Sequence, residues 1–140
     1  MKFLKHFLAI FLVATLTLVT TAAFSQNKIY NLKPTKTTLS GTDTTYLTAA
    51  YVGAHETASF QYVHDKLTGT VGGSVILEVS NNGTTWTTIG EDTLTLTNVA
   101  QTQKIWSITP FNYRSARLKV LTSGSQTSQA SCTAYFIHPK

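Results

Sequence analysis

The chain has 140 residues, of which only 12% are charged, and its formal net charge is +5. Lys2 and Lys5 carry two of these positive charges, and the +3 that remains is too weak and too scattered to predict a nucleic-acid partner. A chain of this length forms one domain that can fold without metal ions or disulfides.

Residues 1–25 are typical of an export signal. Two lysines precede an apolar run, and Ala23 and Ser25 occupy the small-residue positions that signal peptidase reads. The apolar core is shorter than the roughly 20 residues that span a bilayer, so we expect cleavage after Ser25. An uncleaved anchor is the alternative, and residues 7–24 would then hold the protein on a membrane. Either way, we expect an exported protein that is secreted or lies on a cell or virion surface.

Residues 26–43 show little periodicity and predict an irregular leading arm. In residues 44–140, short runs rich in threonine, valine, tyrosine and isoleucine are separated by glycine, asparagine and serine, which is typical of a domain made of strands. The expected strands cover residues 44–52, 58–67, 93–97, 102–109, 114–122 and 129–137, with a hairpin over residues 75–89. Since no helical period follows residue 25, we predict an all-β fold. It is an antiparallel β-sandwich of the jelly-roll or immunoglobulin-like type behind an N-terminal hydrophobic signal or anchor helix. A barrel is the alternative.

Asn82 and Gly83 form the strongest turn signal in the chain. Their order, between β-branched residues, predicts a two-residue hairpin loop in which both residues adopt positive φ. They also begin an Asn-Gly-Thr glycosylation sequon, but the turn already explains them. Gly72 and Gly73 predict a break before the hairpin, and Pro110 predicts a corner, since proline is excluded from central strands.

The reactive side chains do not predict a catalytic or metal site. Cys132 is the single cysteine, and the alternation around it places it on an inward face, as a small buried hydrophobe. In His55-Glu56 and His64-Asp65 the two neighbours point to opposite faces of a strand, so we expect surface histidines beside turns. Glu91-Asp92 reads as a solvated turn. With no nucleophile elbow and no phosphate-binding loop, we expect no enzyme and no cofactor.

Five aromatic and basic residues are candidates for binding. We expect Trp86 and Trp106 to fill the core, because large aromatic side chains usually do so in a small sandwich. The alternative for an exposed tryptophan is a platform on which a sugar ring stacks. Tyr113, Arg114 and Arg117 lie near the proline corner, where they would form a basic aromatic patch for glycans or anionic groups. Solvated surface cations are the competing interpretation of the two arginines.

Two segments resemble known families. Residues 80–86, Ser-Asn-Asn-Gly-Thr-Thr-Trp, resemble the Ser-x-Asp-Gly-x-x-Trp hairpin of small β-sandwich modules in tailed-phage virion proteins, structural or decoration proteins, and of discoidin-like domains. Residues 115–120 resemble the strand that follows it in both, and the likeness extends over residues 58–137. Asn82 stands where Asp is usual, and the paired terminal cysteines of many discoidin domains are absent, so the likeness to discoidin-like domains is the weaker one.

The resemblance implies a non-enzymatic structural or attachment module, displayed on a virion or exported to the cell surface. Such a module acts through self-assembly or surface contacts, as a symmetric homo-oligomer (trimers or higher) or with other virion or surface proteins. The alternative is a secreted carbohydrate-binding module, with Trp86 or Tyr113 stacking on the glycan. Neither reading involves nucleic acid or a metal.

Overall fold

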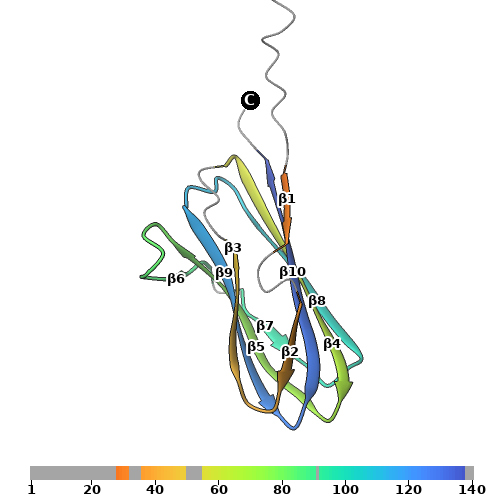
Figure 1. Ribbon diagram of the computed structural model, residues 1–140. Coiled ribbons are helices and arrows are strands. Elements are labelled where there is room, and N and C mark those ends of the chain that lie inside the picture. The colour runs from red at the N-terminus through yellow and green to blue at the C-terminus, as the bar shows by residue number, and fades with distance from the viewer. Residues whose placement is uncertain (1–27, 32–35, 50–54, 91, 138–140) are drawn as a thin grey trace, which may run out of the picture.

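The computed structural model describes residues 28–31, 36–49, 55–90 and 92–137, which fold into two antiparallel sheets packed face to face (Figure 1). These residues contain strands and no helix, so the predicted all-β class and the two antiparallel sheets are confirmed. The strands are β1 (Lys28–Asn31), β2 (Thr37–Ser40), β3 (Thr44–Ala49), β4 (Thr57–Thr68), β5 (Val71–Ser80), β6 (Thr87–Thr88), β7 (Leu94–Leu96), β8 (Gln101–Ile108), β9 (Ser115–Gly124) and β10 (Thr127–Ile137).

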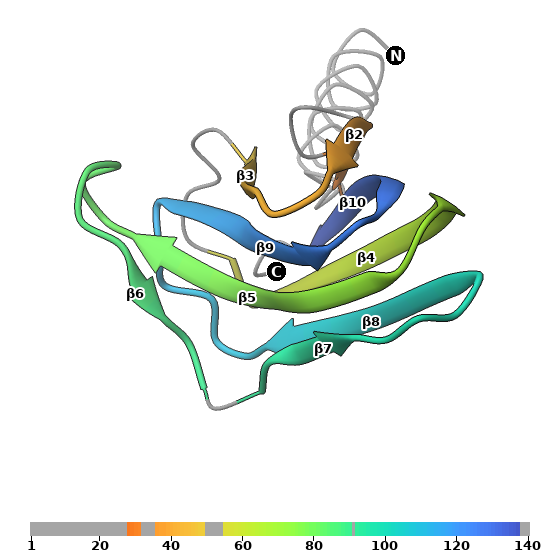
Figure 2. The same ribbon diagram turned by 90° about the horizontal axis from the view of Figure 1, so that it is seen from below.

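The chain alternates between the two sheets (Figure 2). The first sheet has the order β1-β10-β4-β8, and β2 also pairs with β10. The second has the order β3-β9-β5-β6, and β7 also pairs with β5. From β2 onward every connection crosses from one sheet to the other, except those that join β5, β6 and β7 within the second sheet. Strands distant in sequence therefore lie side by side, and loops gather at the two ends of the sandwich.

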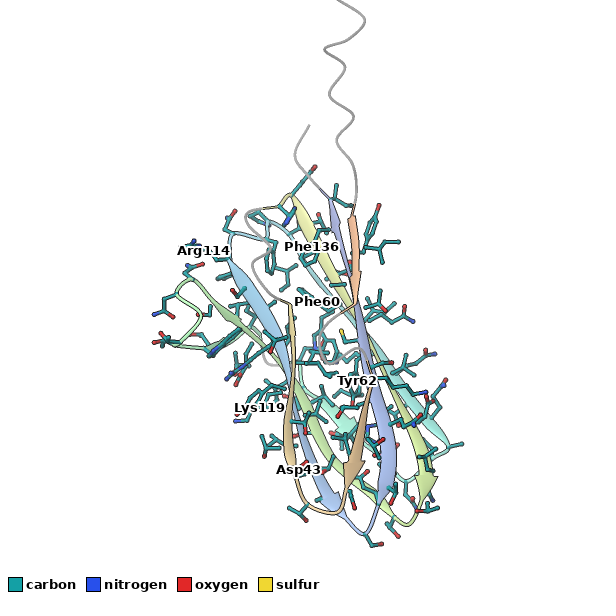
Figure 3. The ribbon with its side chains drawn as sticks, in the orientation of Figure 1. Asp43, Phe60, Tyr62, Arg114, Lys119 and Phe136 are labelled. Carbon is teal, nitrogen blue, oxygen red and sulfur yellow. The ribbon has the colours of Figure 1, made fainter. Side chains whose placement is uncertain are left out.

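The core lies between the sheets because the inward residues of each strand alternate with outward ones, as the sequence predicted. In β9 the buried apolar residues are Ala116, Leu118 and Val120, with Arg117 and Lys119 outward. The large inward rings include Phe60, Tyr62, Phe111 and Phe136. Figure 3 shows Phe60, Tyr62 and Phe136 between the sheets and Lys119 on the outside.

Cys132 lies on this inward face and is only 2% exposed, as predicted. Burial raises the pKa of its thiol far above the ordinary range, because an apolar setting disfavours the thiolate. The side chain therefore packs as a small hydrophobe rather than serving as a nucleophile.

The predicted break at Gly72 and Gly73 is wrong, since β5 starts at Val71 and runs through both glycines. Gly73 has φ +123°, and a Cβ atom there would stand 2.0 Å from the carbonyl oxygen of Leu121. Glycine thus lets the β5 backbone lie against β9 at a point where no other residue fits. The corner at Pro110 is confirmed: the Thr109–Pro110 peptide bond is cis, and the chain leaves β8 there.

We predicted an irregular arm over residues 26–43, and this is wrong in part, because β1 and β2 lie within it. Lys28–Asn31 pairs with residues 133–136 of β10, and Thr37–Ser40 pairs with residues 127–130. The predicted signal or anchor helix over residues 1–25 lies outside the described residues. In the part of the chain that the structure describes, no helix has the length and apolarity needed to cross a membrane.

Candidate functional site

The loop of residues 81–86 joins β5 to β6 and projects from the sandwich at the left of Figure 1. The predicted two-residue turn is wrong: the last strand pair is Val79 with Thr87, and no described residue other than glycine has positive φ. Gly83 has φ +74°, but Asn82 instead holds the loop through its side chain. Its Oδ1 accepts hydrogen bonds from the backbone N–H groups of Thr84 (2.9 Å) and Thr85 (2.8 Å). A side-chain turn of this kind suits a longer loop than the backbone turn we expected.

Trp86 ends this loop and lies on the outer face of the second sheet, where it meets Arg117. The guanidinium carbon of Arg117 is 4.1 Å from the Trp86 ring centroid and 4.1 Å from the Tyr46 ring centroid. The cation is thus held between two aromatic rings, one from the loop and one from the edge strand β3. We call Tyr46, Trp86 and Arg117 the aromatic–arginine stack. The prediction that Trp86 fills the core is wrong, because the loop places its ring on the outer face of the second sheet against Arg117.

Glu78, on the neighbouring strand β5, fixes the position of Arg117. The two residues face each other across β5 and β9, and Arg117 Nε donates a hydrogen bond to Glu78 Oε2 over 2.6 Å. The side chain of Arg117 is only 19% exposed and that of Glu78 only 11%. Paired with a carboxylate and stacked on two rings, Arg117 is a rigid part of the surface rather than a solvated cation. The arrangement offers aromatic surface and a guanidinium edge, which suit a sugar ring or an anionic group.

Tyr113 and Arg114 do not join the stack. Tyr113 packs against the core and meets Phe111 edge-on, with ring centroids 5.5 Å apart. It lines a hollow of about 380 Å³ beside the loop, whose other walls include Asn81 and Thr85. Arg114 is exposed, and its backbone N–H donates to Asn81 Oδ1 over 3.2 Å. The basic aromatic patch predicted from these residues is therefore two separate features.

Trp106 is in the core as predicted, with 5% of its surface exposed. Its Nε1 donates to the backbone oxygen of Asp92 over 2.7 Å, and Lys104 Nζ lies 5.4 Å from its ring centroid. Lys104 also forms an ion pair with the Asp92 side chain. Asp92 of the predicted acidic turn thus contacts two residues of β8, and Glu91 lies outside the described residues.

The prediction of surface histidines is wrong. His55 is 4% exposed and His64 is 1% exposed. His64 continues the inward alternation of Phe60 and Tyr62, and its Nδ1 lies 2.9 Å from the Tyr62 hydroxyl. Among the described residues, no group of three or more His, Cys, Asp or Glu side chains is placed to hold a metal ion.

Among the described side chains, the outer face of the first sheet is almost uncharged, unlike that of the second. We call it the neutral face. Its side chains are those that alternate with the buried ones, namely Ile29 of β1, Ser59, Gln61, Val63 and Asp65 of β4, Gln101, Gln103, Ile105 and Ser107 of β8, and Gln129, Ser131, Thr133 and Tyr135 of β10. Asp65 is its one charged member, and Gln101 Nε2 donates to it over 2.7 Å. Ile29, Ile105 and Tyr135 remain 71%, 59% and 36% exposed.

Sequence comparison finds no matching family model and no matching curated protein. Solved structures share the fold. The chain is 17% identical to the phage PBSX exported protein XepA, with a TM-score of 0.56 over 81% of this chain and 38% of that one. It is 13% identical to VP2 of the infectious bursal disease virus subviral particle, with a TM-score of 0.52 over 80% and 33% of the two chains. A structure of the Gt strain of the same virus gives 16% identity and a TM-score of 0.51 over 81% and 33%.

These similarities concern the fold, and the chain spans only 33% to 38% of the length of those proteins. At the level of the fold, they confirm the predicted resemblance to β-sandwich modules of phage and virion proteins.

Proposed function

We propose that the chain is a non-enzymatic structural module that is displayed on a virion or exported to the cell surface, where it acts through contacts with other proteins. One observation carries the proposal: the neutral face has a single charge and leaves Ile29, Ile105 and Tyr135 exposed. Exposed apolar side chains on an otherwise uncharged sheet face suit a contact with another protein. Hydroxyl and amide side chains between the apolar ones are also compatible with such a contact.

The topology supports this use. Strands β2-β10-β4-β8 face strands β3-β9-β5-β7, which is the order of a jelly roll, and this fold is common in viral capsids. Structures of similar fold include an exported phage protein and a subviral particle of VP2. Export of this chain would follow from residues 1–25, if they serve as the predicted signal.

Light scattering coupled to size-exclusion chromatography tests the proposal. We expect the full chain to form oligomers whose population grows with concentration. Gln61→Lys places a charge in the middle of the neutral face and should shift the population toward monomer. Thr95→Lys, at an exposed position of β7 on the other sheet, is the matched control and should leave the distribution unchanged. A strict monomer at high concentration, with no other protein retained from a native preparation, would contradict the proposal.

The aromatic–arginine stack supports a second candidate, a carbohydrate-binding module. Trp86 and Tyr46 present ring surface beside a fixed guanidinium, which suits a sugar that carries a carboxylate. A glycan array on the full chain, repeated with Trp86→Ala, tests this function. Tyr135→Ala, which removes an exposed ring from the opposite face, is the control. Absence of binding to every glycan on the array would retire this candidate.

A further inference from the structure

We propose that β8 pairs in antiparallel fashion with β8 of a second copy, about a two-fold axis at Ile105. The two first sheets would then join into one continuous sheet. The inference rests on the proposed assembly function and names the contact through which assembly occurs. It is argued from the hydrogen-bond pattern of β8, from the protection of the other edges, and from the side chains that the pairing would bring together.

The backbone groups of β8 alternate between its neighbour β4 and the open edge of the sheet. Lys66 N–H donates to the carbonyl of Ala100 over 2.9 Å, which identifies residues 66 and 100 as a hydrogen-bonded pair in the register of β4 and β8. Hydrogen-bonded pairs recur at every second residue, so the even-numbered residues of β8 bond to β4. The N–H and C=O groups of the odd-numbered residues point away from β4. In the described residues, the one ladder that β8 joins is the one with β4.

The other edges of the sandwich are short or lie beside charged side chains, whereas β8 is long and its one charge, Lys104, is paired with Asp92. Proteins usually protect an edge strand by shortening it or by adding charge, proline or a bulge. Strands β1 and β2 have four residues each, and β6 and β7 have two and three. The six residues of β3 lie beside Arg117 and Lys119. Strand β8 has eight residues in unbroken register with β4, and its outward residues Gln101, Gln103, Ile105 and Ser107 carry no charge.

The side chains select one register of β8 against its own copy. With the axis at Ile105, the two Ile105 side chains meet on the neutral face, and Gln103 meets Ser107 on either side. Apolar thus pairs with apolar, and amide with hydroxyl. Moving the axis to Lys104 would set two lysines directly opposite each other, which destabilises a strand pair. The preferred register also leaves each Lys104 free to keep its own Asp92.

A second copy fits this edge better than an unrelated strand because the edge is complementary to itself under two-fold rotation. The edge borders a hollow of about 320 Å³ lined by Gln61, Gln103, Lys104 and Ile105. Ile105 of the second copy would cover this hollow. The pairing would thereby bury Ile105, whose side chain is 59% exposed in the single chain. The contact closes a dimer, so larger assemblies would need another part of the neutral face as well.

Disulfide trapping tests the register. In a hydrogen-bonded antiparallel pair the Cα atoms lie about 5.5 Å apart, within the range of about 4.4–6.8 Å that a disulfide bridges. The Ile105→Cys variant is expressed as the full chain, with any signal cleavage left to the host cell. It should therefore convert to a covalent dimer under mild oxidation. Leu67→Cys, 51% exposed and outside β8, should give at least tenfold less dimer. The native Cys132 is buried and should not interfere.

Light scattering of the unmodified chain separates the two levels of the proposal. Oligomers together with efficient trapping at position 105 support the β8 contact. Oligomers in which position 105 traps no better than position 67 overturn the β8 contact and leave the assembly function standing. A monomer at all concentrations overturns the β8 contact, and it overturns the assembly function as well if no other protein is retained from a native preparation. Ile105→Pro gives an independent check, because it removes an N–H that points away from β4, and it should weaken dimerisation at least tenfold while the β-sheet circular dichroism stays unchanged.

Discussion

Arg117 and Glu78 form a hydrogen-bonded ion pair of 2.6 Å on the outer face of the second sheet, where both side chains are mostly withdrawn from water. The pair explains why an arginine in the middle of a strand, with outward orientation, does not extend into solvent. Glu78 holds the Nε edge, while Tyr46 and Trp86 cover the two faces of the guanidinium. The pair thus positions the stack that a ligand would meet.

We expect Arg117→Ala to lower the free energy of unfolding by about 2 kcal/mol, because the Glu78 carboxylate would lose a charge-assisted hydrogen bond at a largely buried site. Glu78→Gln should cost less, since the amide oxygen still accepts from Nε. Urea unfolding followed by circular dichroism measures both. Lys119→Ala, the neighbouring outward cation on β9, is the control and should change stability by less than about 0.5 kcal/mol. Equal effects at positions 117 and 119 would contradict a fixed stack.

Gly73→Ala should be severely destabilising, by about 3 kcal/mol or more. A methyl group would collide with the Leu121 carbonyl, which lies 2.0 Å from the Cβ position, and φ +123° is strained for alanine. Gly41→Ala is the matched control, because φ there is +63° but no atom lies within 4 Å of the added Cβ. It should cost only about 1 kcal/mol, from backbone strain alone. Thermal unfolding of the two variants distinguishes the close approach from the strain.

Asn82→Ala should cost about 1 kcal/mol, since the N–H groups of Thr84 and Thr85 lose the acceptor that orders the loop. Asn82→Asp keeps an oxygen that accepts both hydrogen bonds and should leave stability nearly unchanged, which fits the Asp of the phage-type hairpin. Tryptophan fluorescence reports the second consequence. A disordered loop releases Trp86 from Arg117, so acrylamide should quench the alanine variant more strongly than the aspartate variant. Identical quenching would mean that Asn82 does not position Trp86.

The alternation within strands was predictable, because it is written locally in the sequence. Ala116, Leu118 and Val120 alternate with more polar residues along the sequence and are buried, and Cys132 is buried as expected. His64 carried the same signal, because it lies two residues beyond Tyr62 and therefore on the same face of the strand as Phe60 and Tyr62. Treating histidine as a polar surface residue overrode a periodicity that indicated burial.

Features that depend on pairing between distant segments could not be predicted from the sequence. Strands β1 and β2 have four residues each and exist because β10 supplies partners about 90 to 110 residues away. Tyr46 joined the candidate site in the same way, since its contact with Arg117 follows from the register of β3 against β9. Trp86 was misplaced because its side chain belongs to a loop, where the rule that large aromatics fill the core does not apply.

Acidification should destabilise the protein through His64. Burial lowers the pKa of this imidazole below its ordinary value of about 6.5, and the nearby Gln126 amide and Asp65 carboxylate offset the shift only in part. Gln126 lies near, but His64 Nε2 makes no hydrogen bond of normal geometry in the folded core.

His64 binds the proton more tightly in the unfolded chain than in the folded one. The free energy of unfolding is therefore highest above pH 6.5, and it decreases as the pH falls toward the pKa of His64 in the folded protein. Each unit of difference between the two pKa values corresponds to about 1.4 kcal/mol. Urea unfolding between pH 8 and pH 5 should show this loss, and His64→Gln should flatten the profile. Tyr62→Phe removes the hydroxyl at Nδ1 but keeps the titrating ring, so its slope should persist. A His64→Gln profile as steep as that of the unmodified chain would assign the pH dependence to other groups.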